Sequence, residues 1–142
     1  MKVKEVMTRN PAFCTPEDGL QQAARRMCDS DCGELPVVDS RASMKPVGVL
    51  TDRDIVCRAV ARGKNPLEKQ VSDIMSAPPV TVTPDTDVDA CCELLEERRI
   101  RRVPVVDDAG RLCGIVSQAD IALKCGAQKA GEIVRRVSQA AA

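Results

Sequence analysis

Two short segments of the sequence place the same chemically active side chains at the same spacing. GVLTDRDI contains Thr51 and, three residues later, Asp54, and GIVSQADI contains Ser117 and Asp120. In both segments an apolar run typical of a strand leads directly into the hydroxyl residue, where a helix is expected to start. A hydroxyl and a carboxylate in the first turn of a helix predict either a structural cap or a ligand-binding site.

The structural interpretation is a capping box. In that arrangement the hydroxyl and the acid three residues later each accept a hydrogen bond from a backbone N–H group that the helix leaves unpaired. The functional interpretation is nucleotide binding. The N-terminus of a helix attracts phosphate, and an ionised carboxylate can accept hydrogen bonds from both hydroxyls of a ribose. The two interpretations are compatible, because a capped helix can still share its N–H groups with a bound phosphate.

The two segments belong to a tandem repeat. Val3 aligns with Val71 and Leu35 with Val103, at a constant offset of 68 residues, and the alignment extends through LPVVD in the first copy and VPVVD in the second. The offset falls to 66 residues after the loop 40–45, which is two residues longer than its counterpart. A match that runs in one order through both copies with one small gap indicates one structural unit used twice.

Each copy is predicted to have the element order β-α-β-β-α. The first strand ends at Thr-Pro in both copies, so that Thr15 and Thr83 suit the N-cap and the prolines the first helical position. Two strands joined by a polar loop then form a hairpin, and a second helix starts at Thr51 or Ser117. The predicted elements are strands 12–14, 35–39 and 46–50 with helix 17–30 in the first copy, and strands 80–82, 103–106 and 112–116 with helix 85–99 in the second.

The fold class that follows is α+β, built from α/β-type repeats. The apolar face of one repeat is too large for one copy to cover, so the copies are expected to pack through their sheets with pseudo-two-fold symmetry. A C-terminal tail carries Ile133, Val134 and Val137 at helical spacing, which predicts a terminal helix that docks on the domain or on a partner. The predicted domains are repeat 1 over 1–62, a linker over 63–70, repeat 2 over 71–125 and a helical tail over 126–142.

Composition argues against several classes of function. The 142 residues carry 21 basic and 21 acidic side chains, so no net positive field attracts nucleic acid. One Phe without any Trp or Tyr leaves no aromatic platform for stacked bases, and nucleic-acid binding is not expected. No apolar run reaches the roughly 18 residues that span a bilayer, and the N-terminus lacks an apolar secretion signal. A cytoplasmic protein without membrane attachment is expected.

Eight cysteines raise the alternatives of metal, redox or packing roles. The chain has no histidine and no CxxC pair, so the usual zinc spacings and a Cys–His catalytic pair are absent, and no metal site is expected. Cysteine also alternates with apolar residues between the copies, as where Cys14 aligns with Val82. Buried, reduced cysteine behaves in this way. For a redox or metal role, Cys28 and Cys32 are the first candidates.

The repeated motifs resemble those of a tandem pair of CBS domains, a family named after cystathionine β-synthase. The resemblance covers residues 3–124 and rests on motifs that occur in the same order in both copies: Met-Thr or Met-Ser, Thr-Pro, LPVVD or VPVVD, and the GVLTDRDI pattern. It implies that adenosine compounds such as AMP, ADP, ATP or S-adenosylmethionine bind in clefts between the repeats. It also implies a homodimer, with no catalytic residues and no required cofactor.

The resemblance also implies roles for single residues. Asp54 and Asp120 would bind ribose, Thr51 and Ser117 would face phosphate, and apolar and backbone groups would enclose the base. The residues expected around the base are Cys14, Thr15, Leu35, Pro36, Val80, Val82, Val103 and Pro104. The charged residues that complete the predicted ligand-binding set are Asp52, Arg53 and Arg102.

Charge distinguishes the two expected sites. Arg101 and Arg102 precede a strand in the second copy, where family members often carry a basic residue that reaches phosphate, and Gly33 and Glu34 stand there in the first. At about 4 Å and an effective dielectric near 20, opposite unit charges attract by roughly 4 kcal/mol before desolvation costs. The alternative is that these arginines belong to a solvated helix end. We expect the second site to prefer the more phosphorylated ligand, and the first to be weaker, different or unoccupied.

The leading functional hypothesis is a regulatory sensor without catalysis. Ligand binding would favour one arrangement of the repeats, and a separate protein effector would respond to it. One alternative is a structural module that dimerises and binds no ligand, and another is a sensor of S-adenosylmethionine or an NAD-type compound. An enzyme or redox protein that uses the cysteines is disfavoured, because no nucleophile arrangement is recognisable.

Overall fold

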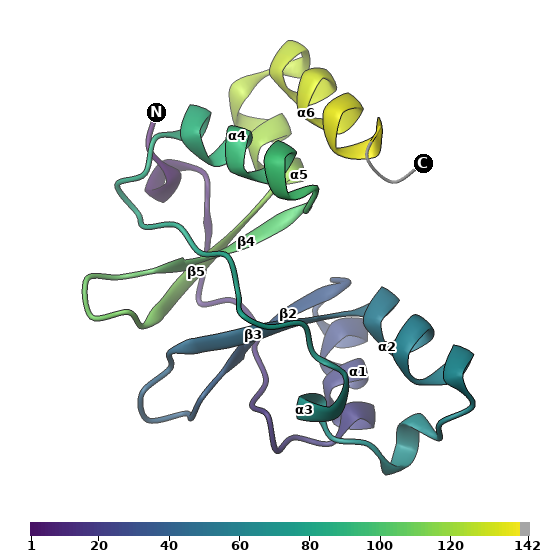
Figure 1. The fold of residues 1–142 in the computed structure, drawn as a ribbon. Coiled ribbons are helices and arrows are strands. Elements are labelled where there is room, and N and C mark those ends of the chain that lie inside the picture. The colour runs from purple at the N-terminus through teal and green to yellow at the C-terminus, as the bar shows by residue number, and fades with distance from the viewer. Residues whose placement is uncertain (140–142) are drawn as a thin grey trace. The chain divides into compact units, whose positions relative to one another are not determined.

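The protein divides into two compact units, each with helices packed on a small sheet (Figure 1). The structure is a computed structural model that describes residues 1–139, except for the side chains of 127–130. The first-repeat unit consists of residues 11–79 and 110–112, and the second-repeat unit of residues 1–10, 80–109 and, within the described chain, 113–139. The mixed helix and strand content confirms the predicted α+β fold class.

The first-repeat unit is built around an antiparallel hairpin. Leu35 lies opposite Leu50 and Glu34 opposite Thr51, as the predicted strand pair requires. The elements of this unit are α1 (Leu20–Asp29), β2 (Glu34–Val38), β3 (Pro46–Thr51), α2 (Asp52–Arg58) and α3 (Val71–Ile74), with 3-10 helices at Val60–Arg62 and Pro66–Glu68. α1 packs on β2 and α2 on β3, and apolar side chains from both layers form the core.

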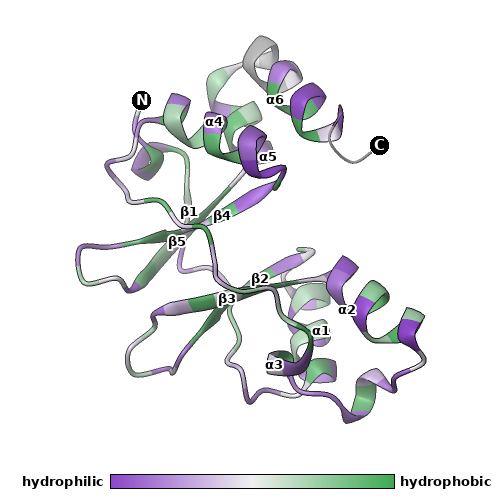
Figure 2. Cartoon of the chain, in the orientation of Figure 1, coloured by the Kyte–Doolittle hydropathy of each residue, from purple (hydrophilic) through white to green (hydrophobic). Residues whose placement is uncertain are grey.

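The second-repeat unit has three strands in the order β1-β5-β4. Its elements are a 3-10 helix (Val3–Glu5), β1 (Thr8–Arg9), α4 (Val88–Arg98), β4 (Arg102–Val106), β5 (Leu112–Ser117), α5 (Gln118–Cys125) and α6 (Ala127–Gln139). Of the predicted tail stripe, Ile133 and Val137 are buried in this unit's core and Val134 is exposed. Figure 2 shows hydrophobic and hydrophilic residues alternating along α4 and α6, as in helices that bury one side. Residues 140–142 of the predicted tail lie outside the described part of the chain.

The opening segments of the two repeats are exchanged between the units. Residues 1–10 pack in the second-repeat unit, where Thr8 pairs with Ile115 across β1 and β5. The equivalent segment of the second repeat packs in the first-repeat unit, where Ser76 and Val49 exchange two backbone hydrogen bonds of 2.9 Å. The compact units therefore differ from the sequence repeats 1–62 and 71–125 in these segments.

Two predicted details of the repeat are wrong. The helices α1 and α4 begin after Gly19 and Asp87, not at Thr15 and Thr83. The Thr-Pro segment forms a turn instead, in which the Asp18 N–H donates to Thr15 O at 3.1 Å and the Asp18 carboxylate accepts from the Thr15 N–H at 2.9 Å. The predicted first strands are also reduced to single bridges, at Cys14 and at Val82.

Candidate functional site

The N-terminus of α2 is closed by a capping box. Thr51 Oγ1 accepts from the Asp54 N–H at 3.0 Å, and Asp54 Oδ2 accepts from the Thr51 N–H at 3.1 Å. The Asp54 carboxylate also receives the Ser76 hydroxyl at 3.2 Å and lies 3.8 Å from Arg58 Nε. Much of the hydrogen-bonding capacity of this carboxylate is therefore used inside the first-repeat unit.

The N-terminus of α5 repeats the capping box with fewer contacts. Ser117 Oγ accepts from the Asp120 N–H at 3.0 Å, and Asp120 Oδ2 accepts from the Ser117 N–H at 2.9 Å. Among the described side chains, no further group binds the Asp120 carboxylate. Because an ionised carboxylate offers about four lone-pair sites, Asp120 keeps more acceptor capacity than Asp54, which also accepts from Ser76.

Each helix N-terminus lies against the residues that precede its partner strand. The Gln118 N–H donates to Arg101 O at 2.9 Å, and the Asp52 N–H donates to Gly33 O at the same distance. This contact places Arg101 and Arg102 beside the first turn of α5. The backbone of Arg101 thus contacts the helix that carries the capping box of the second copy.

The first copy has acidic residues near the helix N-terminus, where the second copy has basic residues. Glu34 pairs with Thr51 across the hairpin, and the Asp52 carboxylate lies over Gly33, where a Cβ atom would come within 2.8 Å of Oδ2. Asp52 Oδ1 also accepts from the Arg53 N–H at 2.8 Å, so this carboxylate caps its own helix. Negative charge beside the N-terminus of α2 opposes a bound phosphate, whereas Arg101 and Arg102 favour one at α5.

The residues predicted to enclose the base lie next to these helix ends, but several are core residues. The backbone of Cys14 bonds to Pro36 O, and that of Val82 to Pro104 O. Residues of this set with buried side chains are Cys14, Thr15, Leu35, Pro36, Val82, Val103 and Pro104, and Val80 is half-buried. Their backbone and neighbours, more than these side chains, are what a ligand could contact. Of the predicted charged residues, Arg102 is half-buried and Asp52 and Arg53 are exposed.

Three polar residues near the helix ends were missed by the sequence analysis. Ser76 reaches Asp54, and Arg58 donates to Met75 O at 3.0 Å, which ties the exchanged segment to α2. The repeated Met-Thr and Met-Ser motif was a signal that could have identified Ser76. The side-chain oxygen of Gln118 is buried without a hydrogen-bond partner among the described residues, and no sequence pattern indicated it.

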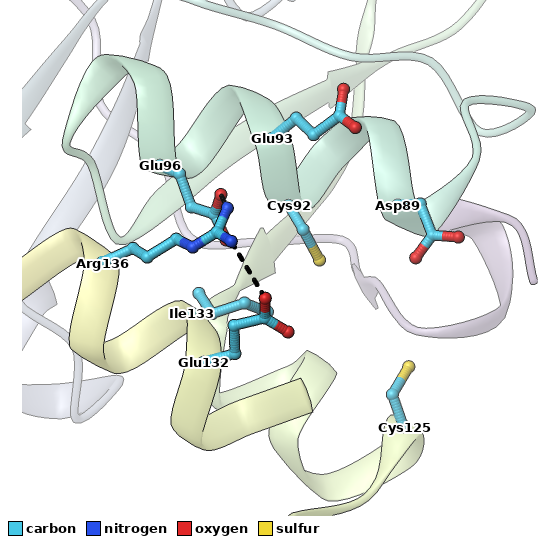
Figure 3. A pocket seen from close by; sticks show the side chains of 8 residues that line it. All are labelled: Asp89, Cys92, Glu93, Glu96, Cys125, Glu132, Ile133 and Arg136. Atoms are coloured by element: carbon cyan, nitrogen blue, oxygen red, sulfur yellow. Dashed lines mark hydrogen bonds and ion pairs between the residues drawn. The ribbon is translucent and has the colours of Figure 1, made fainter. Parts of the chain in front are cut away.

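A separate pocket of about 520 Å³ lies in the second-repeat unit between α4, α6 and the end of α5 (Figure 3). The described side chains of its wall include four carboxylates and one guanidinium, and the thiols of Cys92 and Cys125 face it. The guanidinium of Arg136 is bound to Glu96 at 2.8 Å and to Glu132 at 3.1 Å. With acids in excess among its described side chains and Arg136 already paired, this pocket disfavours phosphate and is a poor nucleotide site.

The cysteines range from fully buried to exposed. Cys14 and Cys91 are fully buried, and burial raises the pKa of the Cys14 thiol to about 12 and that of Cys91 to about 11. Cys28 and Cys57 are exposed, and Cys32 is half-buried. Among the described residues, no three Cys, Asp or Glu side chains are arranged to hold a metal ion.

No described helix has both the length and the apolar content needed to cross a bilayer.

Thiol alkylation is expected to follow this division. In the native protein at pH 8, iodoacetamide should modify Cys28 and Cys57 within minutes and leave Cys14 and Cys91 unmodified, because the thiolate is the reactive form and needs access. Peptide mass spectrometry before and after addition of denaturant measures the difference. Equal labelling of Cys14 and Cys28 in the native protein would contradict the packing role assigned to Cys14.

Comparisons with known proteins agree with the geometry of the repeat. The model of the CBS domain family matches residues 3–60 and 71–125. An uncharacterized protein of Methanopyrus kandleri, MK0525, is 37% identical over 121 residues, which are 85% of this chain and 61% of that relative. The chain thus spans less than two thirds of that relative's length.

Two solved structures similar to this chain contain adenosine compounds. The CBS domain pair of protein MJ0100, in complex with 5′-methylthioadenosine and S-adenosyl-L-methionine, has a TM-score of 0.79 and 31% identity, and the match covers 89% of this chain and all of that one. CBSX2 in complex with AMP has a TM-score of 0.75 and 26% identity, with 87% of this chain and 95% of that one covered. Proteins with this fold therefore bind both phosphorylated and phosphate-free adenosine ligands.

Proposed function

This chain belongs to the CBS domain family, and from that premise we propose that it is a non-catalytic regulatory module that binds an adenosine nucleotide at the N-terminus of α5. The observation that carries the proposal is the Asp120 carboxylate, whose acceptor sites are only partly used among the described residues, on a helix whose first N–H group donates to Arg101 O. Asp120 accepts the ribose hydroxyls, and the two arginines with the Ser117 end of the helix bind phosphate. AMP, ADP and ATP all fit this description.

Regulation requires that the ligand binds one conformation of the protein more tightly than another. We propose that the chain acts as a homodimer and that the signal passes to a separate protein effector. Support for ligand binding comes from the match to the CBS domain family and from the adenosine ligands of similar structures. A ligand-free dimerisation module is the rival, and it requires that no adenosine compound binds at millimolar concentration.

A second candidate function applies to the first-repeat unit. Glu34 and Asp52 place negative charge beside the α2 N-terminus, which disfavours phosphate. A phosphate-free or cationic adenosine compound, of the S-adenosylmethionine class, suits that environment better. Calorimetric titration with S-adenosylmethionine would show binding that survives Asp120→Asn and is weakened by Asp54→Asn.

Paired aspartate variants test the main proposal. We expect Asp120→Asn to weaken AMP binding about 10-fold, because a neutral amide accepts weaker hydrogen bonds from ribose, and Asp54→Asn to change it little. Isothermal titration calorimetry measures both affinities, and the capping hydrogen bonds of the asparagine variants keep the helices intact. Equal losses of AMP affinity in the two variants would contradict the proposal that the two sites differ in nucleotide binding.

The wild-type chain barely absorbs at 280 nm, so a 260 nm band in the purified protein would also reveal a co-purified nucleotide.

A further inference from the structure

The side chain of Gln118 is a polar group whose hydrogen bonding the fold does not complete. Its amide oxygen is buried and has no hydrogen-bond partner among the described residues. An amide oxygen removed from water without a partner costs about 1–3 kcal/mol, so native proteins keep few of them. Beside a capping box whose own hydrogen bonds are complete, such an atom indicates that a partner from outside the fold completes the hydrogen bond.

Gln118 adjoins the residues of the proposed nucleotide site. Gln118 is the first residue of α5, directly after Ser117 and two residues before Asp120. Its backbone N–H donates to Arg101 O at 2.9 Å, so Gln118 connects the residue before β4 to the capped end of α5. Any ligand that contacts both Asp120 and Arg102 passes close to it.

The equivalent residue of the first copy has a different arrangement. Asp52 stands at the same helix position, but its carboxylate accepts from the Arg53 N–H at 2.8 Å and covers Gly33. This carboxylate already has a hydrogen-bond donor within the protein, so no ligand is required to satisfy it. The two copies therefore differ at this position in charge, and only the second has a buried side-chain oxygen without a hydrogen-bond partner among the described residues.

We propose that Gln118 is a specificity-determining residue of the second site, whose amide oxygen accepts a hydrogen bond from a donor on the bound nucleotide. This inference rests on the proposed function of the α5 N-terminus. An adenosine nucleotide offers two kinds of donor near such a group, the ribose hydroxyls and the 6-amino group of the base. A nucleotide without the relevant donor leaves the oxygen unpaired and binds more weakly.

Gln118→Met separates this role from a structural one. Methionine has nearly the same length and shape but no amide, so the ligand-free variant should melt at the same temperature as wild type or a few degrees higher, because the unpaired buried oxygen is gone. Its affinity for AMP should fall about 3- to 10-fold. A residue that only supported the fold would lose stability and affinity together. Gln21→Met, at an exposed position of α1, is the matched control and should change neither quantity.

Three nucleotides then identify the donor by calorimetry with the wild type and with Gln118→Met. AMP carries both donors, 2′,3′-dideoxy-AMP lacks the ribose hydroxyls and IMP lacks the 6-amino group. The nucleotide without the relevant donor should bind the two proteins equally, and either pattern supports the proposal. Equal losses for all three nucleotides, or an unchanged AMP affinity, would overturn it. If Asp120→Asn still weakened AMP binding in that case, the proposed function would stand and only the role of Gln118 would fall. If the wild type bound none of the three, both would fall.

Discussion

Gly48→Ala is expected to lower the free energy of unfolding by about 3 kcal/mol. A Cβ atom at this position would lie 2.7 Å from Ser76 O, closer than real Cβ atoms approach any backbone oxygen. Ser76 cannot easily retreat, because two backbone hydrogen bonds of 2.9 Å hold it to Val49 and its hydroxyl binds Asp54. Relief of the clash must pull the exchanged segment away from β3. Urea denaturation followed by circular dichroism measures the loss.

Two other glycines serve as controls for this prediction. Gly114→Ala should cost less, because the nearest atom to its Cβ is the Met7 sulfur at 2.8 Å, the end of a flexible side chain, and Thr8 O lies at 3.0 Å. Gly131→Ala meets nothing within 4 Å on helix α6 and should stabilise the protein by up to about 1 kcal/mol. A Gly48→Ala variant as stable as wild type would show that Ser76 is not held against β3 as described.

The exchange that makes Gly48 sensitive was not predictable from the repeat pattern. The segments that open the two copies carry nearly the same residues, with Met7-Thr8 in one and Met75-Ser76 in the other. Each segment could pair with the corresponding strand of either unit, so the sequence does not determine which strand each segment joins. The choice depends on long-range contacts, such as the hydrogen bond of 2.8 Å from the Val3 N–H to Thr86 O.

The capping boxes and hairpins were predictable because their partners are close in sequence. Thr51 and Asp54 contact each other within one helical turn, and the strand pair is joined by a short loop. The start of α1 was mispredicted for the opposite reason. Thr-Pro suits a helix start and a turn equally well, and a distant acceptor decides between them, since the Leu20 N–H donates to Lys69 O at 2.8 Å.

The candidate site shows the same division between local and distant contacts. The charge difference between Arg101-Arg102 and Gly33-Glu34 can be read directly from the sequence. The structure adds that the carbonyl of the residue before each strand accepts a backbone hydrogen bond from the first turn of the next helix. The buried oxygen of Gln118 had no such signal, because a neutral polar residue in a first helical turn is usually solvated.

Reversal of charge at both arginines should produce the largest change in ligand binding. We expect the double variant Arg101→Glu/Arg102→Glu to lose about 100-fold in affinity for ATP. The gross attraction of roughly 4 kcal/mol at 4 Å is reduced by solvent, because Arg101 is exposed and Arg102 half-buried. We expect each reversed side chain to cost about 1.4 kcal/mol of binding free energy, which is a tenfold loss of affinity. Calorimetric titration with ATP at low and high salt measures the loss, which should shrink as salt screens the charges.

Adenosine separates this charge effect from damage to the site. Because adenosine has no phosphate, its affinity should be unchanged in the double variant, whose backbone at residue 101 still accepts the hydrogen bond from Gln118. Arg98→Glu/Arg99→Glu, at the exposed end of α4, carries the same change in net charge and should alter ATP binding only slightly. If the α4 variant lost as much affinity as Arg101→Glu/Arg102→Glu, the arginines would act through the general field of a solvated helix end. A loss confined to residues 101 and 102 and to phosphorylated ligands requires that phosphate binds beside the first turn of α5.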